Sequence, residues 1–500
     1  MLLALSFPKY GNATLGWVAL TPLLVSLTDG PLRRAFTLGL VTGLLYFTGT
    51  LYWITRVMVV YGGVQIWLAV PINIALIAYL ALFPAIFALV LRRLTIAYGP
   101  SAVMAAPVVW VSTELGRTHL FTGFPWVLLG YSQATVLPIA QLASLFGVYG
   151  VSLLVAAGST AFALITIRRM RTPLAWSSAA VYVLTIVLAV AAVAVWGSRR
   201  VAASEWTQAG DPVRVGLIQG NVDQAIKWNP ERASAIFDEY IRMTHDAIRK
   251  GAQLVLWPES STPFLFEEEP AGADRLRALA RQAHVSLLFG SDQIEWKQVG
   301  DRRVPDKYFN SAFLVGADGN TAGVYRKMHL VPFGEYVPLQ RLLFFAAPLT
   351  EQVGTFEPGL DPELLRVNGH PTSVAICYEV VYPSLVREFV QAGSELLTTI
   401  TNDAWFGETS APYQHFEQAS MRAIEEGRYL VRSANTGVSG IVDPYGRVLE
   451  RTAIFEPAVL LGEARFLRTA TVYAQQGDVL AYASVAAVVG LLLASRRRVQ

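Results

Sequence analysis

The chain has 500 residues, of which 53% are hydrophobic and 15% are charged, with a formal net charge of +3 and a single cysteine. Soluble globular proteins contain about 25% charged residues, so the composition excludes an ordinary soluble protein, and also a disordered chain, a collagen and a disulfide-rich scaffold. Only 12 charged residues lie in 1–198 and only 3 in 479–500. We therefore predict a transmembrane domain of about six helices over 1–198, a water-soluble domain over 199–478, and a C-terminal transmembrane helix with a basic cytoplasmic tail over 479–500.

Charge-free apolar stretches give the positions of the predicted membrane helices. A helix needs about 20 apolar residues to cross the hydrocarbon core. Stretches of that order predict helices over residues 10–28, 35–55, 66–91, 94–113, 140–167, 172–198 and 479–495. The apolar opening of the chain, Met1–Leu5, is interpreted as the remainder of one further helix.

Arginine clusters predict the orientation of these helices, because short cytoplasmic loops are rich in Lys and Arg. The strong clusters are Arg33-Arg34, Arg92-Arg93, Arg168–Arg171 and Arg496–Arg498. Placing them in the cytoplasm of a bacterial cell puts the domain over 199–478 on the periplasmic side of a multi-pass inner-membrane protein. This domain has a formal charge of −8, which argues against nucleic-acid binding, since nucleic acids attract basic surfaces.

The soluble domain alternates short apolar runs with amphipathic stretches, a pattern typical of an α/β fold. Strands are predicted over residues 213–219, 254–257, 285–289, 312–315, 323–325, 372–376, 396–400, 429–433 and 438–442. Helices are predicted over 230–249, 272–283, 383–391 and 414–427. The sequence Asp318-Gly319-Asn320 predicts a hairpin turn between two of the strands. We expect paired sheets covered by helices, since that arrangement buries the apolar strands.

Three residues in this domain together supply the chemistry of acyl transfer. Cys377 ends an apolar strand and offers a nucleophile, Glu259 follows another strand and offers a base, and Lys327 offers a cation for a developing oxyanion. Each also has a simpler interpretation on its own: a buried structural thiol, a helix-capping or solvated carboxylate, and a surface lysine. An unpaired thiol on the oxidising side of a membrane favours a functional role, because it is otherwise exposed to oxidation.

Other kinds of active site lack their sequence signatures. The six histidines are not paired at metal-ligand spacing, and the nucleophile-elbow, P-loop and dinucleotide motifs are absent. The sequence therefore predicts neither a metal nor a cofactor.

Three short motifs carry a resemblance to a known superfamily. Trp257-Pro258-Glu259, Arg326-Lys327 and Ile376-Cys377-Tyr378-Glu379 are similar to the signature sites of the nitrilase, or carbon–nitrogen hydrolase, superfamily. The resemblance covers residues 213–465 and implies an α-β-β-α sandwich. It also implies a catalytic triad in which Glu259 accepts protons, Lys327 stabilises the thiolate and the oxyanion, and Cys377 is the nucleophile.

Further motifs and the flanking membrane helices resemble one family within that superfamily, the apolipoprotein N-acyltransferases. The motifs are Thr122–Trp126, Gln219–Asn221, Lys227-Trp228, His329–Glu335 and Asn402–Gly407. The resemblance implies ping-pong transfer of an acyl chain from a phospholipid, typically phosphatidylethanolamine, through a cysteine thioester. The acceptor is the α-amino group of the diacylglyceryl-cysteine of an apolipoprotein, in the last step of bacterial lipoprotein maturation, and we expect a monomer.

The same resemblance implies roles for six further residues. Glu335, Glu379 and Tyr378 support the triad, and Trp228, Trp405 and Trp126 contact the acyl chain or form a mobile lid. The alternatives are buried structural carboxylates for the two acids, core packing for the aromatic residues, and for Trp126 a tryptophan of the interfacial belt.

Two other functions fit parts of the sequence. A membrane-tethered nitrilase or amidase that acts on a small C–N substrate would use the same three residues. A transporter or scaffold with an inactive hydrolase domain is disfavoured, because the predicted spans lack the charges that transport requires.

Overall fold

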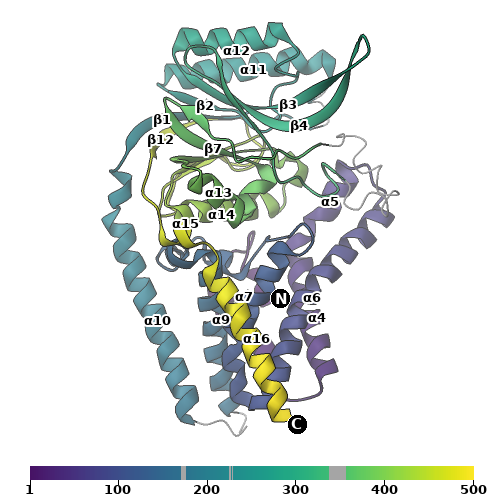
Figure 1. The fold of residues 1–500 in the computed structure, drawn as a ribbon, viewed down its shortest axis with the longest axis vertical. Helices are drawn as coiled ribbons and strands as arrows, with labels where there is room; N and C mark the ends of the chain where they lie inside the picture. The colour runs from purple at the N-terminus through teal and green to yellow at the C-terminus, as the bar shows by residue number, and fades with distance from the viewer. Residues whose placement is uncertain (170–175, 225–226, 228, 337–355, 500) are drawn as a thin grey trace. The chain divides into compact units, whose positions relative to one another are not determined.

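The computed structural model describes residues 1–169, 176–224, 227, 229–336 and 356–499, and the chain forms two compact units (Figure 1). The first, here called the helical unit, comprises Met1–Thr55, Ile66–Ser204 and Thr471–Gln500. The second, here called the α/β unit, comprises Glu205–Ala470 together with Arg56–Gln65. A short segment from the apolar first part of the chain therefore belongs to the α/β unit.

The helical unit combines long and short helices. The long helices are α4 (Leu32–Leu51), α6 (Ile66–Tyr98), α9 (Ala143–Arg169), α10 (Trp176–Ala203) and α16 (Val479–Val499). The shorter ones are α1 (Leu2–Leu5), α2 (Ala13–Gly16), α3 (Thr21–Ser26), α7 (Ala106–His119), α8 (Leu137–Ala140) and α15 (Val472–Gln476). Within the described ranges, α6, α9, α10 and α16 are long and apolar enough to cross a membrane. A fifth span results if α4 and α5 (Trp53–Val60), which are bent by 50°, act as one.

Several predicted membrane helices are interrupted in the structure. The stretch over 35–55 bends by 50° between α4 and α5, and Gly147, with a φ of 64°, breaks the helical backbone inside α9. The stretch over 10–28 forms α2 and α3, with Pro22 in the first turn of α3. The stretch over 94–113 begins inside α6, which continues to Tyr98, and resumes as α7. Gly99 has a φ of 82° and is followed by a proline, and both features stop an α-helix. An uninterrupted apolar sequence does not reveal these breaks, because hydropathy indicates whether a segment can lie in lipid and not whether its backbone is helical throughout.

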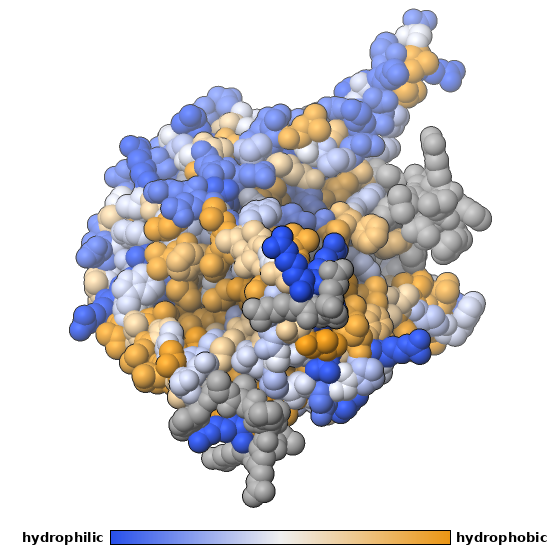
Figure 2. Space-filling model, turned by 60° about the horizontal axis from the view of Figure 1, so that its bottom comes forward, coloured by the Kyte–Doolittle hydropathy of each residue, from blue (hydrophilic) through white to orange (hydrophobic). Residues whose placement is uncertain are grey.

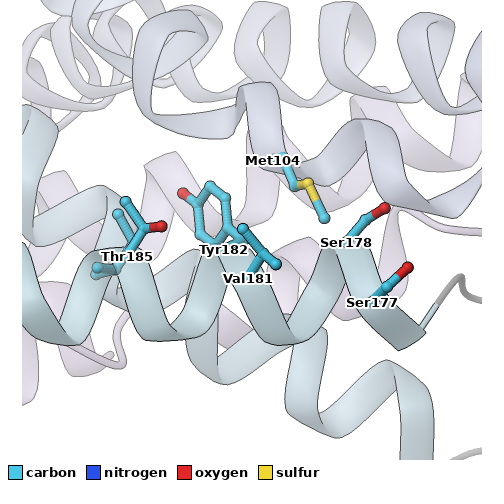
Figure 3. A pocket seen from close by; sticks show the side chains of 7 residues that line it. Met104, Ser177, Ser178, Val181, Tyr182 and Thr185 are labelled. Atoms are coloured by element: carbon cyan, nitrogen blue, oxygen red, sulfur yellow. The ribbon is translucent and has the colours of Figure 1, made fainter.

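The outer surface of the helical unit is apolar. Five large hydrophobic side chains in the described part of α10 are more than half exposed: Val181, Leu184, Val187, Leu188 and Val195. Figure 2 shows broad hydrophobic areas on the surface that is turned forward in that view. Met104 and residues of α10, among them Ser178, Tyr182 and Thr185, line an open groove in this unit (Figure 3). Exposed apolar surface of this extent fits contact with lipid.

Two six-stranded sheets form the α/β unit, in the orders β12-β1-β2-β3-β4-β5 and β11-β10-β9-β8-β7-β6. The strands of the first sheet are β1 (Asp211–Gln219), β2 (Leu254–Leu256), β3 (Ser286–Val299), β4 (Arg302–Val315), β5 (Thr321–Arg326) and β12 (Ala458–Phe466). Those of the second are β6 (Leu365–Val367), β7 (His370–Ile376), β8 (Leu396–Thr401), β9 (Leu430–Ala434), β10 (Gly440–Val442) and β11 (Val448–Arg451). Figure 1 shows α11 (Pro230–Arg249) and α12 (Pro270–Ala283) outside the first sheet, and α13 (Pro383–Gln391) and α14 (Ala411–Glu426) outside the second. The predicted α-β-β-α sandwich is confirmed.

Local sequence signals explain where several of these elements begin. At α11, the Asn229 side chain accepts a hydrogen bond from the Glu231 amide at 2.9 Å, and Pro230 occupies the first turn. Beneath this helix, Phe237, Tyr240 and Trp257 belong to a continuous buried cluster that joins α11 and α12 to the sheet. Burial of these large apolar side chains is the main stabilising contribution on this side of the sandwich.

Candidate active site

The three residues with predicted catalytic roles lie just beyond strands of both sheets. Glu259 follows β2, Lys327 directly follows β5, and Cys377 directly follows β7. All three are buried, with exposed fractions of 6%, 1% and 8%. The Glu259 carboxylate also accepts a hydrogen bond at 2.9 Å from the backbone N–H of Asn402, which follows β8. The site is therefore located where strand ends of the two sheets meet.

A hydrogen-bonded network surrounds the carboxylate of Glu259. Its Oε1 lies 3.3 Å from Lys327 Nζ and accepts a hydrogen bond from Asn310 Nδ2 at 2.8 Å. Glu335 Oε1 accepts a second bond from each of these donors, at 2.8 Å from Lys327 and 2.9 Å from Asn310. Lys327 and Asn310 thus bridge the two carboxylates, which fixes the positions of all four side chains.

The charges in this network differ from those of the same groups in water. Burial raises the pKa of Glu259, but the Lys327 ammonium and the Asn310 amide outweigh it, and the pKa lies below its ordinary value. Burial lowers the pKa of Lys327, but Glu335 and Glu259 raise it well above its ordinary value. The pKa of Cys377 is raised by burial and by the Glu259 charge. At neutral pH the site therefore holds a carboxylate, an ammonium and a protonated thiol.

The backbone at Cys377 adopts a conformation that non-glycine residues rarely take. Its φ is 52°, in the left-handed region, at the start of the short helical turn η5 (Cys377–Val381). Strain of this kind persists only where the surroundings hold it, and it is concentrated at functional sites. On the N-terminal side, Glu379 Oε2 accepts a hydrogen bond from the Ile376 amide at 2.6 Å.

Glu379 also connects the cysteine turn to the segment that follows Lys327. Its Oε1 accepts hydrogen bonds from the Tyr325 hydroxyl at 2.7 Å and from the amides of Met328 at 2.6 Å and His329 at 3.0 Å. The side chain is fully buried, and burial raises its pKa to about 7. Glu335 therefore contacts Lys327 directly, whereas Glu379 holds the backbone on either side of the site.

A second buried lysine lies on the other side of Glu259. Lys227 Nζ is 3.4 Å from the Glu259 carbonyl oxygen, and burial lowers the pKa of Lys227 to about 8. Nearby, Asp292 accepts a hydrogen bond from the Ser260 hydroxyl at 3.0 Å, and burial raises the pKa of Asp292 to about 6. The Lys227 charge adds positive potential at Glu259 and helps to lower its pKa.

The predicted aromatic residues have different surroundings. Tyr378 is buried and packs edge to face against Tyr382, with ring centroids 5.2 Å apart. Trp405 is half-buried in the turn η6 (Asp403–Phe406) and packs edge to face against Tyr61 at 5.4 Å. Tyr61 belongs to the segment Arg56–Gln65 of the same unit. Trp228 lies outside the described residues.

Trp126 belongs to the helical unit and is almost fully buried there, at 1% exposure. It packs against Trp53 with ring centroids 5.3 Å apart, and its carbonyl accepts a hydrogen bond from Arg117 at 2.7 Å. The neighbouring Glu114 accepts a hydrogen bond from the Leu129 amide at 2.6 Å. These two buried charged residues hold the loop that contains Trp126, so its contacts within the unit are those of a packing residue.

Sequence reasoning did not identify two polar residues of the network. Asn310 lies within β4, and no spacing or motif separates it from other polar strand residues. Asn402 lies in the motif over 402–407, and its position after a buried strand is the same signal that singled out Glu259 and Cys377. Among the described residues, no group of three or more His, Cys, Asp or Glu side chains is arranged to hold a metal ion.

Comparison with known proteins covers the whole chain. Residues 1–161 match the model of the apolipoprotein N-acyltransferase N-terminal domain, and residues 214–471 match that of the carbon-nitrogen hydrolases. A protein of Geobacter metallireducens named apolipoprotein N-acyltransferase is 42% identical, over 100% of this chain and 94% of the relative. A protein of Methylococcus capsulatus with the same name is 35% identical, over 100% and 95%. A solved amidase of the nitrilase superfamily from Nesterenkonia is 23% identical, covers 55% of this chain and 98% of its own, and has a TM-score of 0.41.

Proposed function

This chain belongs to the apolipoprotein N-acyltransferase family, and from that premise we propose that it transfers an acyl chain from a phospholipid to the α-amino group of a diacylglyceryl-cysteine at the N-terminus of an apolipoprotein. The acyl chain is carried on Cys377 as a thioester between two half-reactions. Whole-chain similarity to relatives of that name supports the proposal, as does the combination of apolar helices with a nitrilase-like unit.

In the first half-reaction, Glu259 takes the proton of the Cys377 thiol as the sulfur attacks the ester carbonyl of the phospholipid. Negative charge develops on the carbonyl oxygen, and the Lys327 ammonium stabilises it. The carbon–oxygen bond of the ester then breaks, and the protonated Glu259 returns the proton to the leaving oxygen. The products are the thioester and a lysophospholipid.

In the second half-reaction, the neutral α-amine of the apolipoprotein attacks the thioester. Glu259 removes a proton from the nitrogen, Lys327 again stabilises the oxyanion, and the carbon–sulfur bond breaks. The proton returns to the thiolate, which leaves an amide and the free thiol. One base serves both steps, as microscopic reversibility allows.

The observation that carries the proposal is the buried hydrogen-bonded network that joins Glu259 to Lys327. A carboxylate that stays ionised beside an ammonium at 3.3 Å can accept a proton, whereas burial and the Glu259 charge raise the pKa of the Cys377 thiol and hold it in its protonated form. Sulfur therefore becomes nucleophilic only when Glu259 takes its proton. Glu335, Glu379 and Tyr378 support this arrangement, and Trp405 and Trp228 are proposed to contact the acyl chain. For Trp126, burial in the helical unit favours packing over substrate contact.

The cellular setting is part of the proposal. Both substrates are anchored by acyl chains, and moving a chain into water costs about 0.8 kcal/mol per CH₂, so an enzyme held at the membrane avoids that cost. The arginine clusters at 33–34, 92–93 and 496–498 favour the cytoplasmic side. We infer a monomeric inner-membrane protein with its α/β unit on the periplasmic side and phosphatidylethanolamine as a donor.

The test is the acyl-enzyme itself. Purified full-length protein is incubated with a phospholipid that carries palmitate at sn-1, and the mass of intact protein and of the Cys377 peptide is measured. We expect a palmitoyl adduct on Cys377, and its transfer to a synthetic diacylated lipopeptide on addition of that acceptor. A Cys377→Ser variant provides the control. No adduct with phospholipid, together with ammonia release from a small amide, would identify a membrane-tethered amidase instead.

A further inference from the structure

A second cluster of buried polar residues lies behind Cys377 and takes no part in the chemistry described above. It consists of Asp403 from η6, His415 from α14 and Arg432 from β9. None of the three side chains has exposed surface. Buried charges are costly unless they are paired and hydrogen-bonded, so a cluster of this kind has to satisfy a specific need at its position.

His415 connects this cluster to the backbone of the cysteine. Its Nε2 lies 3.1 Å from the carbonyl oxygen of Cys377. Because a carbonyl can only accept, Nε2 has to carry the proton. Cys377 has a φ of 52°. The His415 contact stabilises this conformation on the C-terminal side of Cys377, and the Glu379 contact with the Ile376 amide stabilises it on the N-terminal side.

Arg432 and Asp403 together fix the orientation of the imidazole ring. Arg432 Nη2 lies 2.9 Å from His415 Nδ1 and 2.9 Å from Asp403 Oδ2, and guanidinium nitrogens only donate. The carboxylate oxygen Asp403 Oδ1 also lies 3.0 Å from Nδ1, so Nδ1 contacts both the guanidinium and the carboxylate, while Nε2 donates to the Cys377 carbonyl. Burial and the Arg432 charge lower the pKa of His415, and the neighbouring Asp403 carboxylate opposes them in part. The ring also packs edge to face against Phe406, with centroids 5.9 Å apart.

Asp403 extends the cluster to the thiol side of the cysteine. Its Oδ1 accepts a hydrogen bond from the Thr401 hydroxyl at 2.8 Å, and the Thr401 hydroxyl also hydrogen-bonds the Cys377 thiol. The positive charge of Arg432 keeps Asp403 ionised, so the acceptor for Thr401 is permanent. The cluster thus contacts Cys377 at two points, the carbonyl through His415 and the thiol through Thr401.

We propose that Asp403, His415 and Arg432 form a positioning triad that fixes the carbonyl and the thiol of Cys377 in the geometry required for attack on the acyl ester. This inference rests on the proposed role of Cys377 as the acyl carrier. The three residues exchange no proton with either substrate. Their contribution is alignment, and a misplacement of about 1 Å at the reacting atoms can cost about 100-fold in rate.

Substitutions at His415 separate alignment from general packing. His415→Phe keeps the ring volume and removes the donor to the Cys377 carbonyl. His415→Gln places an amide N–H near the position of Nε2, whereas His415→Asn reaches only the position of Nδ1. If His415 only fills space, the Phe variant should be the fastest of the three in thioester formation. If His415 acts as a donor at Nε2, the Gln variant should be the fastest.

The readout is the single-turnover rate of thioester formation on the full-length protein with the palmitoyl phospholipid. We expect His415→Phe and His415→Asn to be slower than the parent by about 10- to 100-fold, and His415→Gln to lie within about fivefold of it. The Michaelis constant for the diacylated lipopeptide should stay within twofold, because the cluster is not expected to touch the acceptor. Phe237→Leu, in the core beneath α11, controls for loss of stability without loss of the donor.

The outcomes are separable from those of the proposed function. If the parent protein forms no thioester at Cys377, the proposed function fails and no variant is needed to conclude it. If the parent forms the thioester and His415→Phe does so at the parent rate, the positioning triad is refuted. Should His415→Phe not fold, the Gln and Asn variants decide: a Gln variant no faster than the Asn variant overturns the inference.

Discussion

Glu259 has every oxygen engaged by a donor that also belongs to the site. Oε1 faces Lys327 and Asn310, and Oε2 accepts the Asn402 amide across the gap between the two sheets. A carboxylate held this firmly has its charge and direction set before a substrate arrives, which is what a general base requires. The interactions that lower the pKa of Glu259 therefore also fix the orientation of its carboxylate.

Replacing Glu259 by Gln keeps the shape of the side chain and removes its ability to take a proton. We expect the rate of thioester formation to fall by about 10²–10⁴-fold, the range typical for loss of a general base. The measurement is the acyl-enzyme mass assay with time points, and Glu450→Gln at an exposed position is the matched control. A rate within threefold of the parent would show that another group accepts the proton.

Gly290 on β3 shows how closely the backbone packs beside this carboxylate. A Cβ at this position would lie 2.3 Å from the Ser260 amide nitrogen and 2.7 Å from the Glu259 Cα. We expect Gly290→Ala to lower the free energy of unfolding by about 1–3 kcal/mol, as overpacking does, and to reduce turnover because Glu259 moves. Thermal unfolding and the thioester assay measure the two effects. Gly490→Ala, where nothing lies within 4 Å, should change neither.

Glu379 joins two elements, the turn η5 and the segment after β5, through four hydrogen bonds that its carboxyl oxygens accept. Its folded-state pKa of about 7 lies above the ordinary value of 4.5. A carboxyl with a raised pKa stabilises the fold fully below about pH 4.5, and this contribution is lost as the pH rises through 7. The cause is burial of the charge, which the hydrogen bonds to the carboxylate offset only in part.

This linkage predicts a pH dependence of stability. Between pH 5 and pH 8 the unfolding midpoint of the parent protein should fall, with a contribution from Glu379 on the order of 3 kcal/mol at most. Glu379→Gln cannot ionise, so its midpoint should fall less over the same range, although it starts lower because one acceptor is lost. Thermal scans at both pH values test this. Equal slopes for the two proteins would contradict it.

The elements whose bounds were predicted most accurately are those marked by capping residues or prolines at their ends. The bounds predicted for α11 and α13 match the structure, because Asn229-Pro230 and Pro383 mark the first turns. The outer halves of β3 and β4 were not predicted, since they form a polar, largely exposed hairpin without alternating hydrophobicity. Nor was β12, which pairs along its full length with β1, about 250 residues earlier in the chain.

Local signals also decide which residues of the candidate site could be predicted from the sequence. Glu259 and Cys377 could be located because they directly follow buried strands, where side chains leave the core. Asn310 lies in the middle of β4 and becomes part of the site only because β4 passes between Glu259 and Glu335. Its role depends on pairing between distant strands, which no local pattern contains.

At the scale of the whole molecule, the predicted orientation in the membrane can be tested because the chain contains a single cysteine. Cys377 is the single cysteine and is buried, so a Cys377→Ala protein has no thiol of its own, and any introduced cysteine reports only its own position. Asp301 lies on the exposed β3–β4 turn of the α/β unit, and Arg33 is exposed in one of the arginine clusters.

Asp301→Cys and Arg33→Cys in that background should behave oppositely in intact spheroplasts. A membrane-impermeant maleimide is expected to label the cysteine at 301 at once and the one at 33 only after lysis. The reason is that Arg clusters remain in the cytoplasm, which places the α/β unit outside. Labelling at 33 in intact spheroplasts, with 301 protected until lysis, would invert the orientation. It would also put the proposed active site on the side of the membrane opposite to the proposed periplasmic acceptor.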